Sequence, residues 1–444
     1  MAKPLVAVVG RPNVGKSTLF NAIAGEPIAI VKDTPGVTRD RIYADCTWLD
    51  KSFTLIDTGG IEPETSDMLL RHMREQAEVA IETADVIVFL TDVRQGVVDA
   101  DYGVADMLRR SGKPVVLAVN KVDNVQKFGN DVFEFYNLGM GDPVGVSAAS
   151  RLGIGDLLDA VCAHFPDSAG AEEEEDDRPR IAIVGKPNVG KSSIVNRLCG
   201  EERVIVSDIA GTTRDAIDTA VVRNGQEYIL IDTAGLRRKN RIREDLERYS
   251  IIRTVAAVER ADVVVLVIDA SEGVTEQDAK IAGIANERGK GIIVAVNKWD
   301  KVEKTDKTMK EFTEKVQSTL SFMPYAEYIF ISAVTGQRLN KLFELIDMVR
   351  SSQTLRIQTG VLNEIITEAT VMKQPPSDKG HRLKIFYSTQ VAVKPPSFVL
   401  FVNSKELMHF SYLRYLENRI REAFGFRGTA LRFFVRERAG KDAE

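Results

Sequence analysis

Cysteine is scarce in this chain of 444 residues, which contains only Cys46, Cys162 and Cys199. Three cysteines cannot build a disulfide framework, and no Cys-x-x-Cys pair or Cys/His cluster predicts a zinc site. This usage fits a reducing compartment, so we expect a cytoplasmic protein.

Long apolar runs are also absent. No window approaches the roughly 18–20 apolar residues of a membrane span, and runs such as residues 263–268 have the length of a buried strand. The first apolar run leads directly into a glycine motif, without the features of a signal peptide. We therefore expect a soluble protein without membrane contact.

Charge is unevenly distributed along the chain. The net charge is −5, but residues 351–444 hold 15 Lys and Arg against 9 Asp and Glu, or +6, which leaves −11 for residues 1–350. The acidic run at residues 172–177 has nothing apolar to bury. It predicts an extended linker over residues 167–179, and nothing in the sequence supports the alternative of an acidic docking element.

The chain contains an internal duplication. GRPNVGKS at residues 10–17 recurs as GKPNVGKS at 185–192. PGVTRD at 35–40 recurs as AGTTRD, and DTGG at 57–60 recurs as DTAG, both at the same offset of 175. NKVD at 120–123 and Ser147-Ala148 recur at offsets of 177 and 185, which indicates small insertions in late loops. Each copy is long enough for its own core. The predicted domains are 1–166, 180–350 and a C-terminal 351–444.

The order of apolar segments predicts an α/β fold with mostly parallel, doubly wound sheets. In the first copy, strand-length runs alternate with segments of helical spacing, as in parallel sheets covered on both faces. Such sheets bind ligands at the carboxyl ends of their strands, where every motif falls. The expected strands are 5–9, 53–56, 86–90, 115–119 and 144–146, and the expected helices are 16–24, 68–83, 100–111 and 154–164.

The repeated glycine motif predicts a phosphate-binding P-loop in each copy. Its backbone amides converge on phosphates, its lysine reaches the β/γ oxygens and its hydroxyl binds Mg²⁺. The predicted residues are Gly10, Arg11, Pro12, Asn13, Val14, Gly15, Lys16 and Ser17, and Gly185, Lys186, Pro187, Asn188, Val189, Gly190, Lys191 and Ser192.

The DxxG motif that ends an apolar strand predicts a second part of the phosphate site. Its aspartate can hold Mg²⁺ and its glycine amide can sense the γ-phosphate. The predicted residues are Asp57, Thr58, Gly59, Gly60 and Ile61, and Asp232, Thr233, Ala234, Gly235 and Leu236. In the segment before DxxG, one aligned position is threonine in both copies, namely Thr38 and Thr213. We therefore predict these two threonines as switch ligands of Mg²⁺ and the γ-phosphate.

The NKxD motif predicts guanine rather than adenine. Its aspartate can accept two hydrogen bonds from guanine, whereas adenine lacks the exocyclic amine at that edge. The asparagine can bond the base edge, the lysine stem can cover its face and the Ser-Ala pair can offer backbone contact. The predicted residues are Asn120, Lys121, Val122, Asp123, Ser147 and Ala148, and Asn297, Lys298, Trp299, Asp300, Ser332 and Ala333.

Together, these motifs in tandem, joined by an acidic linker and followed by a basic tail, resemble the Der (EngA) family of bacterial double-G-domain GTPases. The resemblance covers essentially the whole chain. It implies GTP/GDP and Mg²⁺ as ligands, a C-terminal KH-like α+β domain, and a monomeric, nucleotide-switched GTPase that acts on the large ribosomal subunit and its rRNA, without DNA. Rival interpretations are a GTP-binding scaffold with negligible hydrolysis and a tRNA-modifying or membrane-transport GTPase.

One departure from Ras-like GTPases concerns the catalytic glutamine after DxxG, where this sequence has Ile61 and Leu236. Neither side chain can position a water molecule. The resemblance suggests instead that Asn13 and Asn188 help to bind K⁺, whose charge stabilises the transition state. The alternative is that these asparagines only cap the loop.

The tail is predicted to contain a helix at 361–372, strands at 383–393 and 398–402, a helical region at 404–424 and a strand at 430–438. A KH domain clamps nucleic acid with a GxxG loop between adjacent helices. The only GxxG here, residues 425–428, precedes the last strand, so we interpret it as a helix cap and turn. The last strand alternates between apolar and arginine-bearing faces, which fits either an RNA surface or a face docked on the acidic domains.

Overall fold

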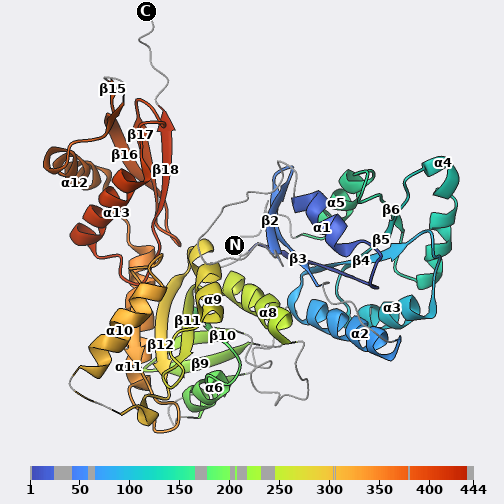
Figure 1. Ribbon diagram of the computed structural model, residues 1–444, viewed down its shortest axis with the longest axis horizontal. Helices are drawn as coiled ribbons and strands as arrows, with labels where there is room; N and C mark the ends of the chain where they lie inside the picture. The colour runs from blue at the N-terminus through green and yellow to red at the C-terminus, as the bar shows by residue number, and fades with distance from the viewer. Residues whose placement is uncertain are drawn as a thin grey trace, which may run out of the picture. The chain divides into compact units, whose positions relative to one another are not determined.

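A computed structural model describes residues 3–24, 43–58, 66–165, 178–200, 206–207, 218–231, 246–303, 305, 307–378 and 381–437. The chain forms two compact units (Figure 1). The first holds the first predicted copy together with residues 246–259, and the second holds the rest of the second copy and the C-terminal domain. No helix of the described residues is long and apolar enough to cross a membrane.

A six-stranded sheet forms the centre of the first unit, in the order β2-β3-β1-β4-β5-β6. All neighbours are parallel except the β2–β3 hairpin. The strands are β1 (Leu5–Gly10), β2 (Tyr43–Trp48), β3 (Lys51–Asp57), β4 (Val86–Asp92), β5 (Val115–Asn120) and β6 (Val144–Gly145).

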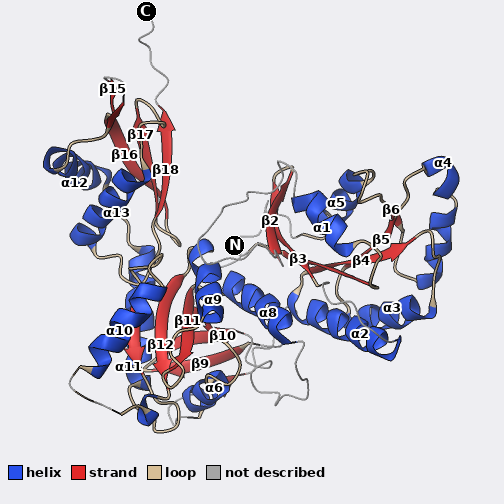
Figure 2. Cartoon of the chain, in the orientation of Figure 1, coloured by secondary structure: helices blue, strands red, loops and turns tan. Residues whose placement is uncertain are grey.

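Helices cover both faces of this sheet, as the uninterrupted apolar strands require. In β1, Val6 and Val8 pack with Leu19 of one helix, whereas Ala7 and Val9 pack on the opposite face with Met73 of another. Figure 2 shows this layered arrangement. The helices are α1 (Lys16–Ala24), α2 (Ser66–Thr83), α3 (Asp99–Ser111), α4 (Val125–Phe128), the 3₁₀ helix η1 (Asp131–Leu138) and α5 (Ile154–Cys162).

The second copy repeats the same sheet with one extra edge strand, in the order β13-β12-β11-β7-β10-β9-β8. Its strands are β7 (Arg180–Val184), β8 (Val206–Ser207), β9 (Thr219–Arg223), β10 (Gln226–Ile231), β11 (Val263–Asp269), β12 (Gly291–Asn297) and β13 (Glu327–Phe330). Its helical elements are α6 (Lys191–Cys199), α8 (Leu246–Arg260), α9 (Glu276–Glu287), η2 (Trp299–Lys301), α10 (Thr308–Thr319) and α11 (Leu339–Thr354).

The predicted strands and helices of the first copy are confirmed, with ends shifted by one or two residues. The prediction omitted β2, whose residues alternate between buried and half-buried positions and include polar side chains. The late insertion in the second copy lies between NKxD and the Ser-Ala pair, where α10 replaces the shorter η1. The acidic run at 172–177 lies outside the described residues.

The C-terminal domain has the order α12-β16-β17-α13-β18, as the tail pattern predicts. Its elements are α12 (Thr359–Met372), β16 (Ile385–Ala392), β17 (Ser397–Val402), α13 (Phe410–Phe424) and β18 (Arg432–Glu437), with a small hairpin of β14 (Ser377–Asp378) and β15 (His381–Arg382). The helical region is shorter than predicted, since α13 begins only at Phe410. The boundary predicted at residue 350 falls inside α11.

The turn that contains the GxxG sequence joins this domain to the second copy within the same unit. Gly425 caps α13 by donating its amide to Arg421, which confirms the interpretation as a helix cap and turn. Gly428 then accepts from the amide of Ile292 at 2.7 Å and donates to the carbonyl of Tyr325 at 2.8 Å. A Cβ at Gly428 would lie 2.3 Å from a methyl of Val349, so only glycine allows this close approach.

Candidate nucleotide-binding sites

Each P-loop lies between a central strand and a helix, at the carboxyl edge of its sheet. Gly15 has φ of 99° and Gly190 has φ of 100°, a left-handed conformation that glycine adopts without strain. A Cβ at these positions would lie 2.4 Å and 2.3 Å from the side-chain amides of Asn120 and Asn297. The loop therefore needs glycine there for its conformation and for its contact with the NKxD motif.

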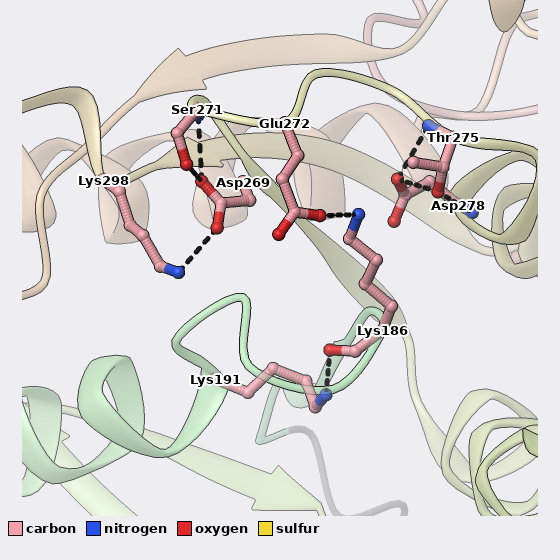
Figure 3. A network of polar contacts seen from close by, with 8 residues as sticks. All are labelled: Lys186, Lys191, Asp269, Ser271, Glu272, Thr275, Asp278 and Lys298. Atoms are coloured by element: carbon pink, nitrogen blue, oxygen red, sulfur yellow. Dashed lines mark hydrogen bonds and ion pairs between the residues drawn. The ribbon is translucent and has the colours of Figure 1, made fainter. Parts of the chain in front are cut away.

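The P-loop lysine is held by its own loop. Lys16 Nζ donates to the carbonyls of the first two loop residues, at 2.7 Å each, and Lys191 Nζ does so at 2.6 and 2.7 Å (Figure 3). Burial lowers the pKa of both ammonium groups to about 8, although the charge of Asp57 opposes this for Lys16 and that of Asp278 for Lys191. A bound phosphate would be a negatively charged partner for these ammonium groups, and it would favour their charged form.

Two of the three predicted Mg²⁺ ligands of the first copy lie side by side. Ser17 Oγ donates to Asp57 Oδ2 at 2.9 Å, and Asp57 is buried. Hydroxyl and carboxylate oxygens suit Mg²⁺, which takes few protein ligands and completes its shell with water and phosphate. Among the described residues, no cluster of three or more His, Cys, Asp or Glu side chains could hold a metal.

The NKxD asparagine ties three motifs together in each copy. Asn120 donates through Nδ2 to the carbonyl of Val14 at 2.7 Å and accepts at Oδ1 from the amide of Ala148 at 2.9 Å. Asn297 makes the same two bonds, at 2.8 and 3.0 Å, to the corresponding residues. Both side-chain amides are buried, and their hydrogen bonds join the P-loop to the Ser-Ala loop. Only the second Nδ2 hydrogen of each asparagine is left for the predicted contact with the base edge.

A buried aspartate that the sequence analysis missed orients the NKxD lysine. Asp92 ends β4 and binds Lys121 Nζ at 2.6 Å, and Asp269 ends β11 and binds Lys298 Nζ at 2.5 Å (Figure 3). Burial alone would raise the pKa of Asp269, but hydrogen bonds from Lys298 and Ser271 outweigh it and lower the pKa.

A signal for these aspartates was present in the sequence. DVRQG at residues 92–96 recurs as DASEG at residues 269–273, at the offset of 177 that also relates the two NKxD motifs. A carboxylate repeated at the end of a buried strand could therefore have been predicted as part of the site.

The aspartate predicted to recognise guanine in the first copy, Asp123, is held by neighbouring side chains. Ser147 Oγ donates to Asp123 Oδ1 at 2.6 Å, and this bond, followed by one from Arg94, lowers the pKa of Asp123. A carboxylate that stays ionised can accept hydrogen bonds from guanine at neutral pH. The structure places Asp300 at the equivalent position, in η2.

Asn13 and Asn188 occupy equivalent strained positions in the two loops. Their φ values are 64° and 63°, in the left-handed region that asparagine tolerates better than most residues. Both side chains are exposed, and the described residues offer no hydrogen-bond partner to either amide. The roles of these asparagines, K⁺ binding or loop capping, stay predictions.

The second P-loop residue differs between the copies. Arg11 Nε donates to the fully buried Asp101 at 2.8 Å, where burial raises the pKa of the carboxyl and Arg11 opposes that rise. In the second copy Lys186 pairs with Glu272 instead (Figure 3). Each P-loop is thus anchored to the segment around the start of α3 or α9 by a different ion pair.

The remaining predicted residues lie outside the described part of the chain. They are Thr38, Gly59, Gly60 and Ile61 in the first copy and Thr213, Asp232, Thr233, Ala234, Gly235 and Leu236 in the second.

Comparison with known proteins decides the family. The family described as "50S ribosome-binding GTPase" matches residues 5–121 and 180–298, and the one described as "KH-domain-like of EngA bacterial GTPase enzymes, C-terminal" matches 356–436. The GTPase Der of Lachnoclostridium phytofermentans is 73% identical over 442 residues, covering all of both chains. The chain belongs to the GTPase Der family. The GTPase Der of Alkaliphilus metalliredigens is 60% identical over the same length.

As a Der-family protein, the chain is a GTP-hydrolysing enzyme with two P-loop G domains and a C-terminal KH-like domain. The family implies GTP and GDP as ligands, typically with Mg²⁺. Among solved structures, the FeoB G domain of Methanococcus jannaschii is 26% identical and covers 37% of this chain and 98% of its own, with a TM-score of 0.29.

Proposed function

We propose that this Der-family GTPase is a switch in the assembly of the large ribosomal subunit, and that it binds ribosomal particles through rRNA in a nucleotide-dependent way. The family description "50S ribosome-binding GTPase" supports the subunit as partner. The +6 charge of residues 351–444 supports an RNA contact by the C-terminal part.

The observation that supports a switch is that β12 contacts both the nucleotide site and the KH-like domain. The carboxyl end of this strand is Asn297, which contacts the P-loop and the Ser-Ala loop. At its amino end, Ile292 and the neighbouring Gly291 bind the turn at Gly428 and Thr429 of the KH-like domain. One buried strand therefore connects the guanine site to the C-terminal domain, and nucleotide binding can bias that domain if it shifts β12.

We further propose that Asn13 and Asn188 help to bind K⁺ during hydrolysis. Their exposed amides have no partner among the described residues, and amide oxygens suit such a cation. K⁺ would supply positive charge where phosphate oxygens gain negative charge. Ile61 and Leu236 stand where a glutamine would otherwise orient water.

Co-sedimentation with purified large ribosomal subunits tests the proposal. The full chain should bind more tightly with a non-hydrolysable GTP analogue than with GDP, or the reverse, and binding should weaken as salt rises because phosphate contacts are lost. Equal affinity in both nucleotide states at every salt concentration would contradict it. Small subunits provide the control particle.

A further inference from the structure

Among the described residues, helices of the KH-like domain cover one face of its three-stranded sheet and leave the other face without a helix. Phe398, Leu400 and Val435 point into a core with Leu362 of α12 and Leu416 of α13, and Figure 2 shows both helices on that side. Because side chains alternate along a strand, the intervening residues point the other way. This outer face consists of Tyr387 and Thr389 of β16, Val399 and Phe401 of β17, and Arg432, Phe434 and Arg436 of β18.

The strand register brings aromatic rings of the outer face together. Tyr387 pairs with Phe401, which pairs with Arg436 on the other side, and the next row holds Phe434 opposite Val399. The rings of Tyr387 and Phe401 are 6.0 Å apart. Tyr387 is 45% exposed and Phe434 is 47% exposed. Tyr387 and Phe434 lie on the two outer strands of the sheet and Phe401 lies on the strand between them. Aromatic rings grouped on one exposed face mark a binding surface.

The charge of the outer face favours a polyanion. None of its seven residues is acidic, and Glu437, the carboxylate of β18, belongs to the opposite alternation. Arg436 is exposed, and the described residues give it no partner. Arg432 donates to the carbonyl of Glu287 at 2.7 Å, so it fixes the edge of the face, whereas Arg436 is available to a phosphate.

The usual nucleic-acid clamp of a KH domain is not available here. Residues 425–428 contain the only GxxG, and Gly428 is bonded to the backbone of the G domain at Ile292 and Tyr325. A nucleic acid must therefore use another surface of this domain. Sheet faces with exposed aromatic side chains stack two or three unpaired bases in other RNA-binding folds.

We propose that the outer face binds a single-stranded segment of RNA, with bases stacked on Tyr387, Phe401 and Phe434 and a phosphate on Arg436. The inference rests on the proposed function, in which RNA is the partner, and adds the site and the mode of recognition. A protein surface would bury the same rings, but it would not need an unpaired arginine beside this pair of rings.

The test uses the full chain and a fluorescently labelled single-stranded RNA of mixed sequence, about 12 nucleotides long. Tyr387→Ala and Phe434→Ala should each weaken binding about tenfold, as expected for loss of one stacked base. Tyr387→Phe should retain wild-type affinity because it keeps the ring. Arg436→Ala should weaken binding and lower its salt dependence.

Two variants on the helical side of the same domain serve as matched controls. Phe410 is 72% exposed at the start of α13, and Arg414 is exposed on the same helix. Phe410→Ala and Arg414→Ala should bind RNA within about twofold of wild type. Unchanged GTP hydrolysis and melting temperature in every variant would show that the domain is folded.

The outcomes separate this inference from the proposed function. If wild type binds large subunits while Tyr387→Ala and Phe434→Ala bind RNA and subunits normally, the outer face is not the RNA site and the proposed function stands. If these variants lose subunit binding but not RNA binding, the face docks a protein and the inference is wrong. If wild type binds no large subunits, the proposed function itself fails.

Discussion

The side-chain amide of Asn297 donates a 2.8 Å hydrogen bond to the main-chain carbonyl of Val189. This bond joins the base-recognition strand β12 to the P-loop, and Asn120 makes the same bond in the first copy. Asn297 is 2% exposed. When its side chain is removed, the carbonyl of Val189 and the amide of Ala333 therefore cannot form hydrogen bonds with water instead. The two halves of each guanine nucleotide site are thus held together by one buried residue.

The first prediction concerns this bond. Asn297→Ala leaves the carbonyl of Val189 and the amide of Ala333 unpaired, at a cost of about 1–3 kcal/mol. We expect the dissociation constant for GDP at the second site to rise at least tenfold, measured by titration in a Lys16→Ala background. The exposed Asn340→Ala is the control and should have no effect. An unchanged affinity in Asn297→Ala would refute the positioning role.

The second prediction concerns Asp269, the residue that sequence analysis missed. Asp269→Asn removes the negative partner of Lys298 but keeps the side-chain shape. We expect several-fold weaker guanine nucleotide binding, because Lys298 loses the ion pair that orients it. Glu276→Gln, an exposed carboxylate in the first turn of α9, controls for a change of local charge. Equal losses in the two variants would contradict a specific role for Asp269.

The third prediction follows from the lowered pKa of Lys191, about 8 without nucleotide. Bound phosphate favours the charged lysine, so its pKa rises on binding and the complex takes up a proton. Affinity should therefore be constant well below pH 8 and fall as pH rises above it, by up to about tenfold per pH unit. Calorimetry in buffers of different ionisation enthalpy measures the uptake.

A control variant distinguishes proton uptake by Lys191 from titration of the guanine base. In the Lys16→Ala/Lys191→Arg double variant the second site has a group that stays charged, so the lysine contribution to proton uptake between pH 8 and 9 should disappear. Persistence of the full uptake would assign it to another group.

The fourth prediction concerns K⁺. Replacing K⁺ by Na⁺ should slow GTP hydrolysis without abolishing GTP binding, because the P-loop lysines and backbone amides that would contact phosphate do not depend on K⁺. The Asn13→Ala/Asn188→Ala variant should lose the difference between the two salts. Equal wild-type rates in K⁺ and Na⁺ would remove the K⁺ mechanism.

Local patterns in the sequence predicted most of the fold. The apolar runs of β1, β4 and β5 are nearly fully buried on both faces, and this burial is what makes a parallel strand recognisable. β2 was missed because it lies at the sheet edge in a hairpin with β3 and carries polar side chains.

Long-range geometry was harder to predict. The repeat identified the P-loops and NKxD motifs, but not that the asparagine amide points at Val14 or that Asp92 holds Lys121. The docking of Gly428 on β12 also depends on two surfaces that are far apart in sequence. A local pattern can identify a turn there, but it cannot identify what the turn contacts.

The central claim is that duplication gives one chain two working guanine nucleotide sites, and the number of nucleotides bound per chain tests it most directly. Equilibrium titration with GDP should give two per wild-type chain and one for each of Lys16→Ala and Lys191→Ala, because each lysine serves its own P-loop. A wild-type value of one, or a loss of both sites in either variant, would contradict the account.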